Sequence, residues 1–274
     1  MPRSLSSVVA LALLAGSVTS AQVTRDAPSY SVASIVNAAS NDASALAPYT
    51  IVTINGQNLA WENHSMQASD IRNGNVPIVL PNAGVRVLIG GEAAGLLAVS
   101  PTQLTVLVPG NLIAGPTPVQ AFLDGVAGPE VLVNLNTSGP GIYAEDPQAA
   151  VVMLLASRPD GTPVTGDLPL QPGERFVLHG TGLGVSDPPL NALQIPDIAA
   201  PLNPVSVFRV YLNGVPLDAS LVLNVSLVPG QAGVFQILLL LPLDAAPNPE
   251  LRIDVDGFRS AAGFLLRVQP LVNQ

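Results

Sequence analysis

Hydrophobic residues in this chain occur in short runs, in which apolar and polar positions alternate and which end at glycine, proline, asparagine or aspartate. This alternation is typical of half-buried β-strands, because successive side chains of a strand point to opposite faces of a sheet. Beyond the N-terminal segment, no stretch has the periodicity of a helix. The sequence therefore predicts an all-β protein. The predicted strands cover residues 32–40, 49–54, 85–89, 96–99, 104–108, 119–123 and 130–135, and then residues 151–156, 175–178, 207–212, 219–225, 235–241, 251–255 and 263–268.

The strand pattern occurs twice. The segment Leu46–Leu59 is matched by Leu170–Leu183, and residues 85–91 are matched by residues 208–214. An Asp-Gly pair, which favours a tight hairpin turn, follows at the corresponding place in each copy. About seven short strands per copy, in units of roughly 110 to 125 residues, predict two tandem immunoglobulin-like β-sandwiches.

The two copies differ by one insertion. Equivalent glycines are 124 positions apart at Gly56 and Gly180, and 132 positions apart at Gly125 and Gly257. This change in spacing places an insertion around residues 226–233, inside the second copy.

The first residues have the features of a signal peptide. Arg3 provides a positive charge, residues 8–16 are apolar, and small residues precede a cleavage site after Ala21. The apolar run is shorter than the roughly 20 residues that span a bilayer, which argues against a membrane anchor. We expect a bacterial protein that is secreted or displayed at the cell surface, with no transmembrane segment in the mature chain. The predicted organisation is a signal peptide at residues 1–21, a first sandwich at residues 22–144 and a second sandwich at residues 145–274.

Composition narrows the possible functions. The chain has no cysteine, which excludes disulfides and thiolate chemistry, and its net charge is −9. All ten basic residues are arginines, and they are scattered along the chain. Nucleic-acid binding requires clustered cations, so no nucleic-acid partner is expected. No cofactor is predicted.

Residues with catalytic potential are few. Gly180, Gly182 and Gly184 follow a predicted strand, but no helix comes after them, so a structural turn is favoured over a phosphate-binding loop. His179 is at a strand end. His64 lies in a polar loop, residues 60–82, where a solvated position is favoured over a metal site.

Two carboxylates complete the candidates for chemistry. Asp254 and Asp256 are two positions apart, as paired catalytic carboxylates can be. Asp256, however, belongs to the predicted hairpin turn, so a solvent-facing strand end is favoured. These patterns predict a non-enzymatic protein.

Two places in the sequence are candidates for interaction. Trp61, the only tryptophan, lies in the polar loop, where it either stacks on a sugar or covers the end of a sandwich. Leu238 and Leu240 occupy positions that are Thr105 and Leu107 in the first copy, so this strand is apolar on both faces. One possibility is that its outer face is covered within the chain by the insertion, by the proline-rich loop at residues 185–205 or by the first domain. The other is that this face forms an intermolecular interface.

Several segments resemble known domains. Residues 50–59, 85–91 and 99–109 resemble the IPT/TIG immunoglobulin-like domain. Residues 35–40, 140–143 and 179–184 resemble an uncharacterised two-part domain found at the C-termini of secreted acidobacterial proteins, including those of Solibacter. The resemblance implies tandem sandwiches that serve as spacers, adhesion modules or interaction modules.

The sequence as a whole predicts a secreted, non-enzymatic structural or interaction module of the cell surface or extracellular matrix. Its partner would be a protein or a glycan, and self-association is one form this could take. The alternative is an extracellular carbohydrate-binding module. Leu238, Leu240 and Trp61 are the candidate interaction residues.

Overall fold

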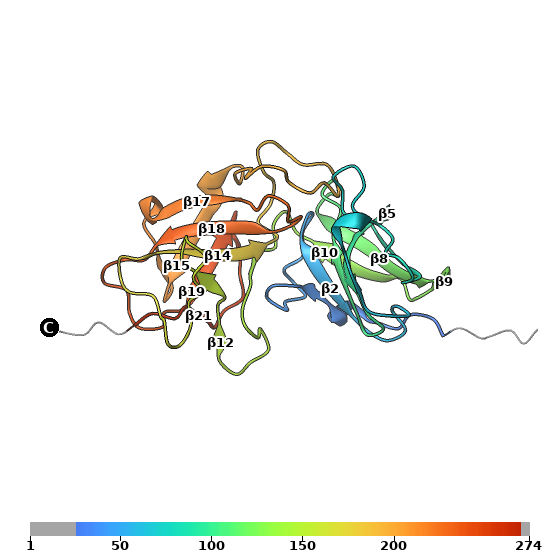
Figure 1. The fold of residues 1–274 in the computed structure, drawn as a ribbon, viewed down its shortest axis with the longest axis horizontal. Coiled ribbons are helices and arrows are strands. Elements are labelled where there is room, and N and C mark those ends of the chain that lie inside the picture. The colour runs from blue at the N-terminus through green and yellow to red at the C-terminus, as the bar shows by residue number, and fades with distance from the viewer. Residues whose placement is uncertain (1–25, 270–274) are drawn as a thin grey trace, which may run out of the picture.

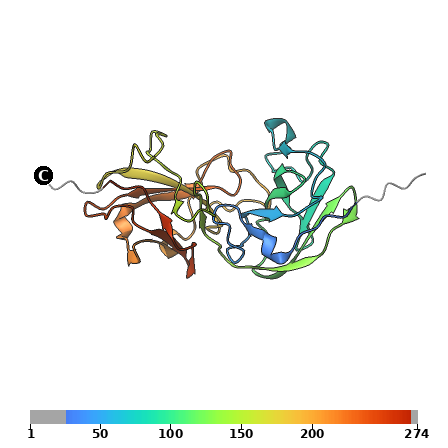
Figure 2. The ribbon, with the colours of Figure 1, turned by 90° about the horizontal axis from the view of Figure 1, so that it is seen from below.

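The computed structural model describes residues 26–269, and the protein is all-β over that range (Figure 1). The predicted signal peptide, residues 1–21, lies outside the described residues. Two lobes lie side by side along the long axis, and the same separation is visible from below (Figure 2). The first lobe contains β1 (Ile35–Asn37), β2 (Ile51–Asn55), β3 (His64–Ser65), β4 (Val85–Ile89), β5 (Glu92–Ala93), β6 (Gly95–Val99), β7 (Gln103–Leu107), β8 (Gly115–Leu123), β9 (Val126–Ala127) and β10 (Val131–Leu135). The second contains β11 (Gly141–Ile142), β12 (Val152–Met153), β13 (Ala156–Ser157), β14 (Arg175–Thr181), β15 (Phe208–Leu212), β16 (Val215–Pro216), β17 (Val222–Leu227), β18 (Phe235–Leu240), β19 (Leu251–Val255), β20 (Phe258–Arg259) and β21 (Phe264–Leu265).

Short 3-10 turns interrupt the strands: η1 (Val32–Ser34), η2 (Ala68–Asp70), η3 (Val205–Val207) and η4 (Ala219–Leu221). The predicted strand at residues 32–40 is therefore divided into η1 and β1. Its start turns because the Ser34 hydroxyl accepts a hydrogen bond from the Ser31 backbone N–H at 3.0 Å, a local bond that competes with strand pairing. Among residues 26–269, no helix is long and apolar enough to cross a membrane.

Each lobe is a β-sandwich, and the two share the order of their central strands. The strand order of one sheet is β1-β2-β7-β6-β3 in the first lobe and β11-β14-β18-β17 in the second. The facing sheet is ordered β10-β8-β4-β5 in the first lobe and β20-β19-β15-β16 in the second, so that β8 and β4 correspond to β19 and β15. The duplicated sequence pattern thus corresponds to two immunoglobulin-like sandwiches, as predicted. Because β11 pairs with β14, the second sandwich includes Gly141–Ile142; a domain division after residue 144 stays a prediction.

The predicted Asp-Gly hairpins are present in both sandwiches. Asp124 and Gly125 have φ angles of 47° and 81°, and Asp256 and Gly257 have φ angles of 54° and 88°. Two successive positive φ angles define the turn whose twist matches that of paired strands. The pairs connect β8 to β9 and β19 to β20.

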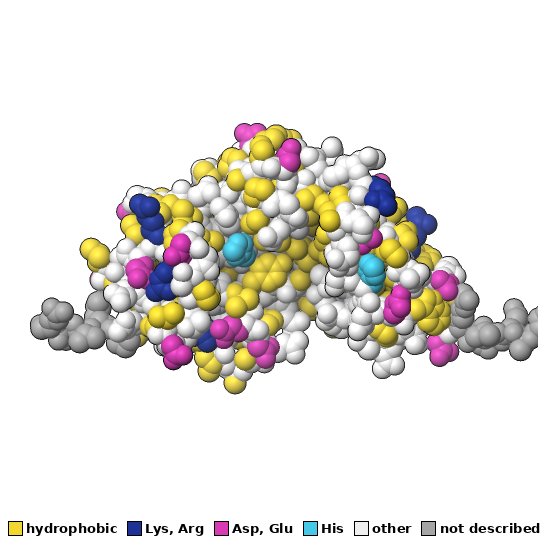
Figure 3. All heavy atoms as spheres, in the orientation of Figure 1, with side chains coloured by type: hydrophobic (Ala, Val, Ile, Leu, Met, Phe, Trp, Pro, Cys, Tyr) yellow, Lys and Arg dark blue, Asp and Glu magenta, His cyan; other side chains and the backbone are white. Residues whose placement is uncertain are grey.

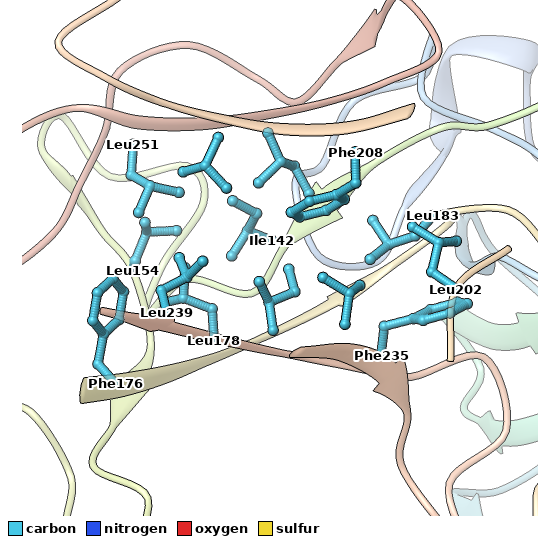
Figure 4. Close-up of a cluster of buried hydrophobic side chains, with 14 of the residues drawn as sticks. Ile142, Leu154, Phe176, Leu178, Leu183, Leu202, Phe208, Phe235, Leu239 and Leu251 are labelled. Atoms are coloured by element: carbon cyan, nitrogen blue, oxygen red, sulfur yellow. The ribbon is translucent and has the colours of Figure 1, made fainter. Parts of the chain in front are cut away.

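Apolar side chains fill the space between the sheets of each sandwich. In the second, Phe176 and Leu178 of β14 and Leu239 of β18 point toward Phe208 of β15 and Leu251 of β19 (Figure 4). All five are buried. The same cluster also includes Tyr49, Ile51 and Leu107 of the first sandwich, so the second core extends across the junction between the lobes.

Hydrogen bonds hold the junction together, most of them between backbone groups. Gly139 N–H donates to the carbonyl of Gly182 at 2.8 Å, and Ile51 N–H donates to the Thr181 hydroxyl at 2.9 Å. The loop at residues 185–205 reaches back onto the first sandwich. In this loop, Leu193 O accepts a hydrogen bond from Val76 N–H of the first sandwich at 2.9 Å. Further bonds across this loop run from Gly110 N–H to Ala192 O, from Ile195 N–H to Gly74 O, and from the Tyr49 hydroxyl to Gln194 O.

The glycine motif that follows β14 belongs to this junction. Gly182 has a φ of +75°, and a Cβ placed there would overlap the carbonyl oxygen of Gly139. A Cβ on Gly180 would approach the carbonyl of Gly141 to 2.6 Å. The motif is a structural turn in which the absence of a side chain permits close packing.

Replacing Gly182 by alanine is expected to destabilise the protein by about 2 kcal/mol or more, because the new Cβ meets backbone at a positive φ. Chemical denaturation of the mature chain measures this loss. Gly166→Ala is the matched control, since a Cβ there has no neighbour within 4 Å, and its effect is expected to stay within about 0.5 kcal/mol. Equal midpoints for the two variants would contradict the close approach.

Candidate interaction surfaces

The insertion in the second copy packs on the first sandwich. It forms the connection between β17 and β18, where Gly233 is buried against Ile51 and Leu107. A Cβ on Gly233 would lie 2.7 Å from Leu107 Cδ1 and 2.8 Å from Ile51 Cγ1. The insertion therefore forms part of the junction.

The outer face of β18 is not fully covered. Along this strand, Phe235, Ile237 and Leu239 are buried, whereas Leu238 and Leu240 on the opposite face are half-buried. Leu238 pairs with Val177 of β14, which is also half-buried. These three branched side chains, Val177, Leu238 and Leu240, form what we call the outer strip.

Polar side chains border the outer strip. His179 pairs with Gln236 along β14 and β18, Arg175 pairs with Leu240, and Asn224 of β17 pairs with Leu238. Burial lowers the pKa of His179 below its usual range, so its imidazole is neutral near pH 7. An apolar strip bordered by polar groups resembles the core and rim of a protein interface.

Trp61 is fixed in orientation and half exposed. Its indole N–H donates to the Asp124 carboxylate at 3.0 Å, and 50% of its surface is accessible. The ring lies against Gly84, where an added Cβ would be 2.9 Å from Nε1. Trp61 thus covers the hairpin end of the first sandwich while leaving part of its surface to solvent.

Two tyrosines of the first sandwich, Tyr30 and Tyr49, have structural roles. Tyr30 donates to the carbonyl of Pro129 at 2.6 Å and accepts from Ala121 N–H at 2.7 Å. Tyr49 is buried, and its hydroxyl donates across the junction to Gln194. Burial raises the pKa of both phenols. Both hydroxyls are thus occupied within the protein.

The other predicted candidates are dispersed. His64 Nε2 lies 3.3 Å from the Asp70 carboxylate in the first sandwich, whereas His179 is in the second. Backbone N–H donation from Gln67 and the His64 contact lower the pKa of Asp70. Asp254 is buried and pairs with Arg259 at 3.0 Å within its own hairpin, and Asp256 is exposed in the turn. No group of three His, Cys, Asp or Glu residues in the described part of the chain is placed to hold a metal ion.

A cleft between the sandwiches was not predicted from the sequence. Its volume is about 410 Å³, and its walls are mainly apolar side chains and backbone. They come from both sandwiches and from the loop at residues 185–205, with Tyr49, Leu112, Leu183, Leu190 and Leu202 among them. No sequence motif marks the cleft because its residues come together only at the junction. Figure 3 shows hydrophobic atoms also gathered in the hollow between the lobes on the face it displays, with charged side chains dispersed over the outer parts.

The fold defines a pair of immunoglobulin-like β-sandwiches joined end to end. No protein-family model matches the sequence, and a search of curated proteins finds no match. Three solved structures illustrate the likeness of fold. They are SGBP-B of the Bacteroides ovatus mixed-linkage glucan utilization locus, solved with a mixed-linkage heptasaccharide; the surface glycan-binding protein PbSGBP-B of Prevotella bryantii; and the full extracellular region of plexin A4.

All three likenesses are distant. SGBP-B is 11% identical, with 83% of this chain and 43% of that chain covered and a TM-score of 0.32. PbSGBP-B is 12% identical, with 81% and 37% covered and a TM-score of 0.27. Plexin A4 is 13% identical, with 91% and 19% covered and a TM-score of 0.29. The chain spans less than half the length of each, and the likeness concerns the class of fold, so it identifies no ligand or partner.

Proposed function

We propose that this chain is an exported, non-enzymatic interaction module of the cell surface or extracellular matrix, and that the outer strip is its contact surface for a protein partner. The observation that carries the proposal is the half-buried pair Leu238 and Leu240 on the outer face of a sheet. The insertion that was a candidate to cover them packs on Ile51 and Leu107. Association with a partner removes such side chains from water, which is favourable.

The junction supports the proposal by fixing the strip relative to the first sandwich. Hydrogen bonds from three separate segments, around residues 139, 181 and 193, cross between the lobes. A surface held on a sheet loses little backbone entropy on binding, because the strands that carry it are already paired. Resemblance of residues 50–59 to IPT/TIG domains agrees with a module of this kind, and membership of that family is part of the proposal.

Export rests on the N-terminal segment, whose charged, apolar and small-residue regions follow in the order of a signal peptide. The protein recovered outside the cytoplasm of its native cell is expected to begin at Gln22. Mass spectrometry of the intact chain measures this. A chain that retains residues 1–21 would contradict cleavage after Ala21.

Changing both strip leucines to aspartate tests the contact surface. Leu238→Asp/Leu240→Asp places two charges where apolar contact is proposed, and is expected to weaken partner binding by about tenfold or more. Light scattering of the mature chain at high concentration measures self-association, and pull-down from the outer surface of the native cell measures binding to other proteins.

Leu243→Asp is the matched control, since Leu243 is 79% exposed in the loop after β18 and lies outside the strip. It is expected to leave binding unchanged. Equal binding by the double variant and the control, with both folded by circular dichroism, would exclude the outer strip as the contact surface.

The alternative function is carbohydrate binding at Trp61. It is favoured by the fixed indole, whose N–H is bonded to Asp124 while half of the residue stays exposed. Amphipathic aromatic rings that are held in place can provide rigid contact area for a ligand. Under this alternative, glycan-array binding by the wild-type chain is lost in Trp61→Ala and largely kept in Trp61→Phe. Absence of wild-type binding on the array would remove the alternative.

A further inference from the structure

The second sandwich pairs one of its edges with a segment that has no counterpart in the first. Strand β12 runs parallel to β21, with Val152 opposite Phe264 and Met153 opposite Leu265. Leu154 N–H donates to Leu265 O at 2.9 Å, and Leu170 N–H donates to Arg267 O at 3.0 Å. The edge of β21 is thus occupied along its length by the chain itself.

The equivalent edge in the first sandwich belongs to β10. One hydrogen bond is conserved between the copies: Gln269 N–H donates to Leu170 O, and Asn136 N–H donates to Leu46 O, each at 2.8 Å. Asn136 and Gln269 are therefore equivalent, and Leu132 and Leu265, each four residues earlier, are equivalent too. The chain between β1 and β2 is short, residues 38–50, whereas residues 143–174 separate β11 from β14 and contain β12. Among residues 26–269, the first sandwich therefore has no counterpart of β12, while Leu46 takes the place of Leu170.

The backbone of β10 has groups that point away from β8, its one strand partner among residues 26–269. Leu132 lies opposite Pro118 of β8, and Pro118 O accepts from Gly90 N–H on the far side of β8. Pro118 is thus turned away from β10. In an antiparallel ladder the residue opposite such a position also turns its N–H and C=O outward, so Leu132 and, two positions on, Asn134 face outward.

These outward groups form an open edge. Within residues 26–269, β10 pairs with β8 alone, and no backbone hydrogen bond is made to Leu132 from the outer side. The open part of the edge ends before Asn136, whose N–H donates to Leu46 O. The turn η1 lies beside β10 and contributes no hydrogen bond to it. Leu132 is 62% exposed, and Val32 of η1 is 50% exposed. β10 contains no charged residue, no proline and no bulge, which are three of the devices that block strand addition.

We propose that the open edge of β10 binds an extended segment of a partner protein by strand addition, and that this segment is uncharged, apolar and parallel to β10. The direction and the chemistry follow from β12, because the duplicated sandwich carries Val152–Leu154 in that orientation on the counterpart strand. Main-chain hydrogen bonds to Leu132 supply affinity in this mode, and alternate side chains supply specificity. The site is separate from the outer strip and does not depend on it.

The test uses a peptide of residues 149–157 of this chain, with solubilising lysines at both ends, added to the mature protein. Binding is expected, and hydrogen exchange at the Leu132 amide is expected to slow at least tenfold when the peptide is bound. A peptide of scrambled order with alternating glutamates is the control ligand. No binding at millimolar peptide, or protection confined to β21, would overturn the proposal.

Two variants at one position separate backbone from side chain. Leu132→Pro removes the outward N–H and is expected to weaken peptide binding at least tenfold. An edge strand tolerates proline at a position whose N–H faces solvent. Leu132→Thr keeps the N–H and is expected to retain binding within about threefold. Should the proline variant not fold, the exchange measurement on the wild-type chain still decides. Dimerisation of the wild-type chain through β10, lost in Leu132→Pro, would assign the edge to a second copy and overturn the proposed partner.

Discussion

The two sandwiches are held together by a contact between backbone segments that is too close to admit a side chain. Gly139 and Gly182 meet where the first sandwich passes into the second, and their N–H and C=O groups bond directly. Buried polar groups of the main chain require partners, and here each sandwich supplies partners for the other. The core of the second sandwich then continues onto Ile51 and Leu107. The arrangement of both lobes depends on this contact.

The junction also determines which surfaces remain available. Two segments of the second copy, the loop at residues 185–205 and the insertion before β18, are both directed toward the first sandwich. Since they are used there, the outer face of β18 keeps only partial cover. In the described part of the chain, the first sandwich has no segment equivalent to β12, and β10 has one strand partner. Each copy is thus incomplete at a different place.

Much of this fold could be predicted from the sequence. Alternation of apolar and polar residues located β4 and β19 at their observed bounds, and the two Asp-Gly pairs located the hairpins because few other residues accept positive φ. Alternation also predicted that Leu238 and Leu240 share a face, although their binding role stays a prediction. Spacing revealed the length of the insertion, but a length does not specify which surface a loop packs on. The pairing of β12 with β21 joins residues more than a hundred positions apart, and no local pattern encodes it.

The junction has a consequence for how such a protein can change over generations. Most of its hydrogen bonds run between main-chain groups, which every residue except proline retains in full. The angle between the lobes is therefore largely insensitive to which side chains surround it, provided that a few glycines are kept. Surface residues on either lobe can be exchanged freely while the spacing between them is preserved. Substitutions on the surface of either lobe can therefore change what the protein binds while the fold and the arrangement of the lobes are kept.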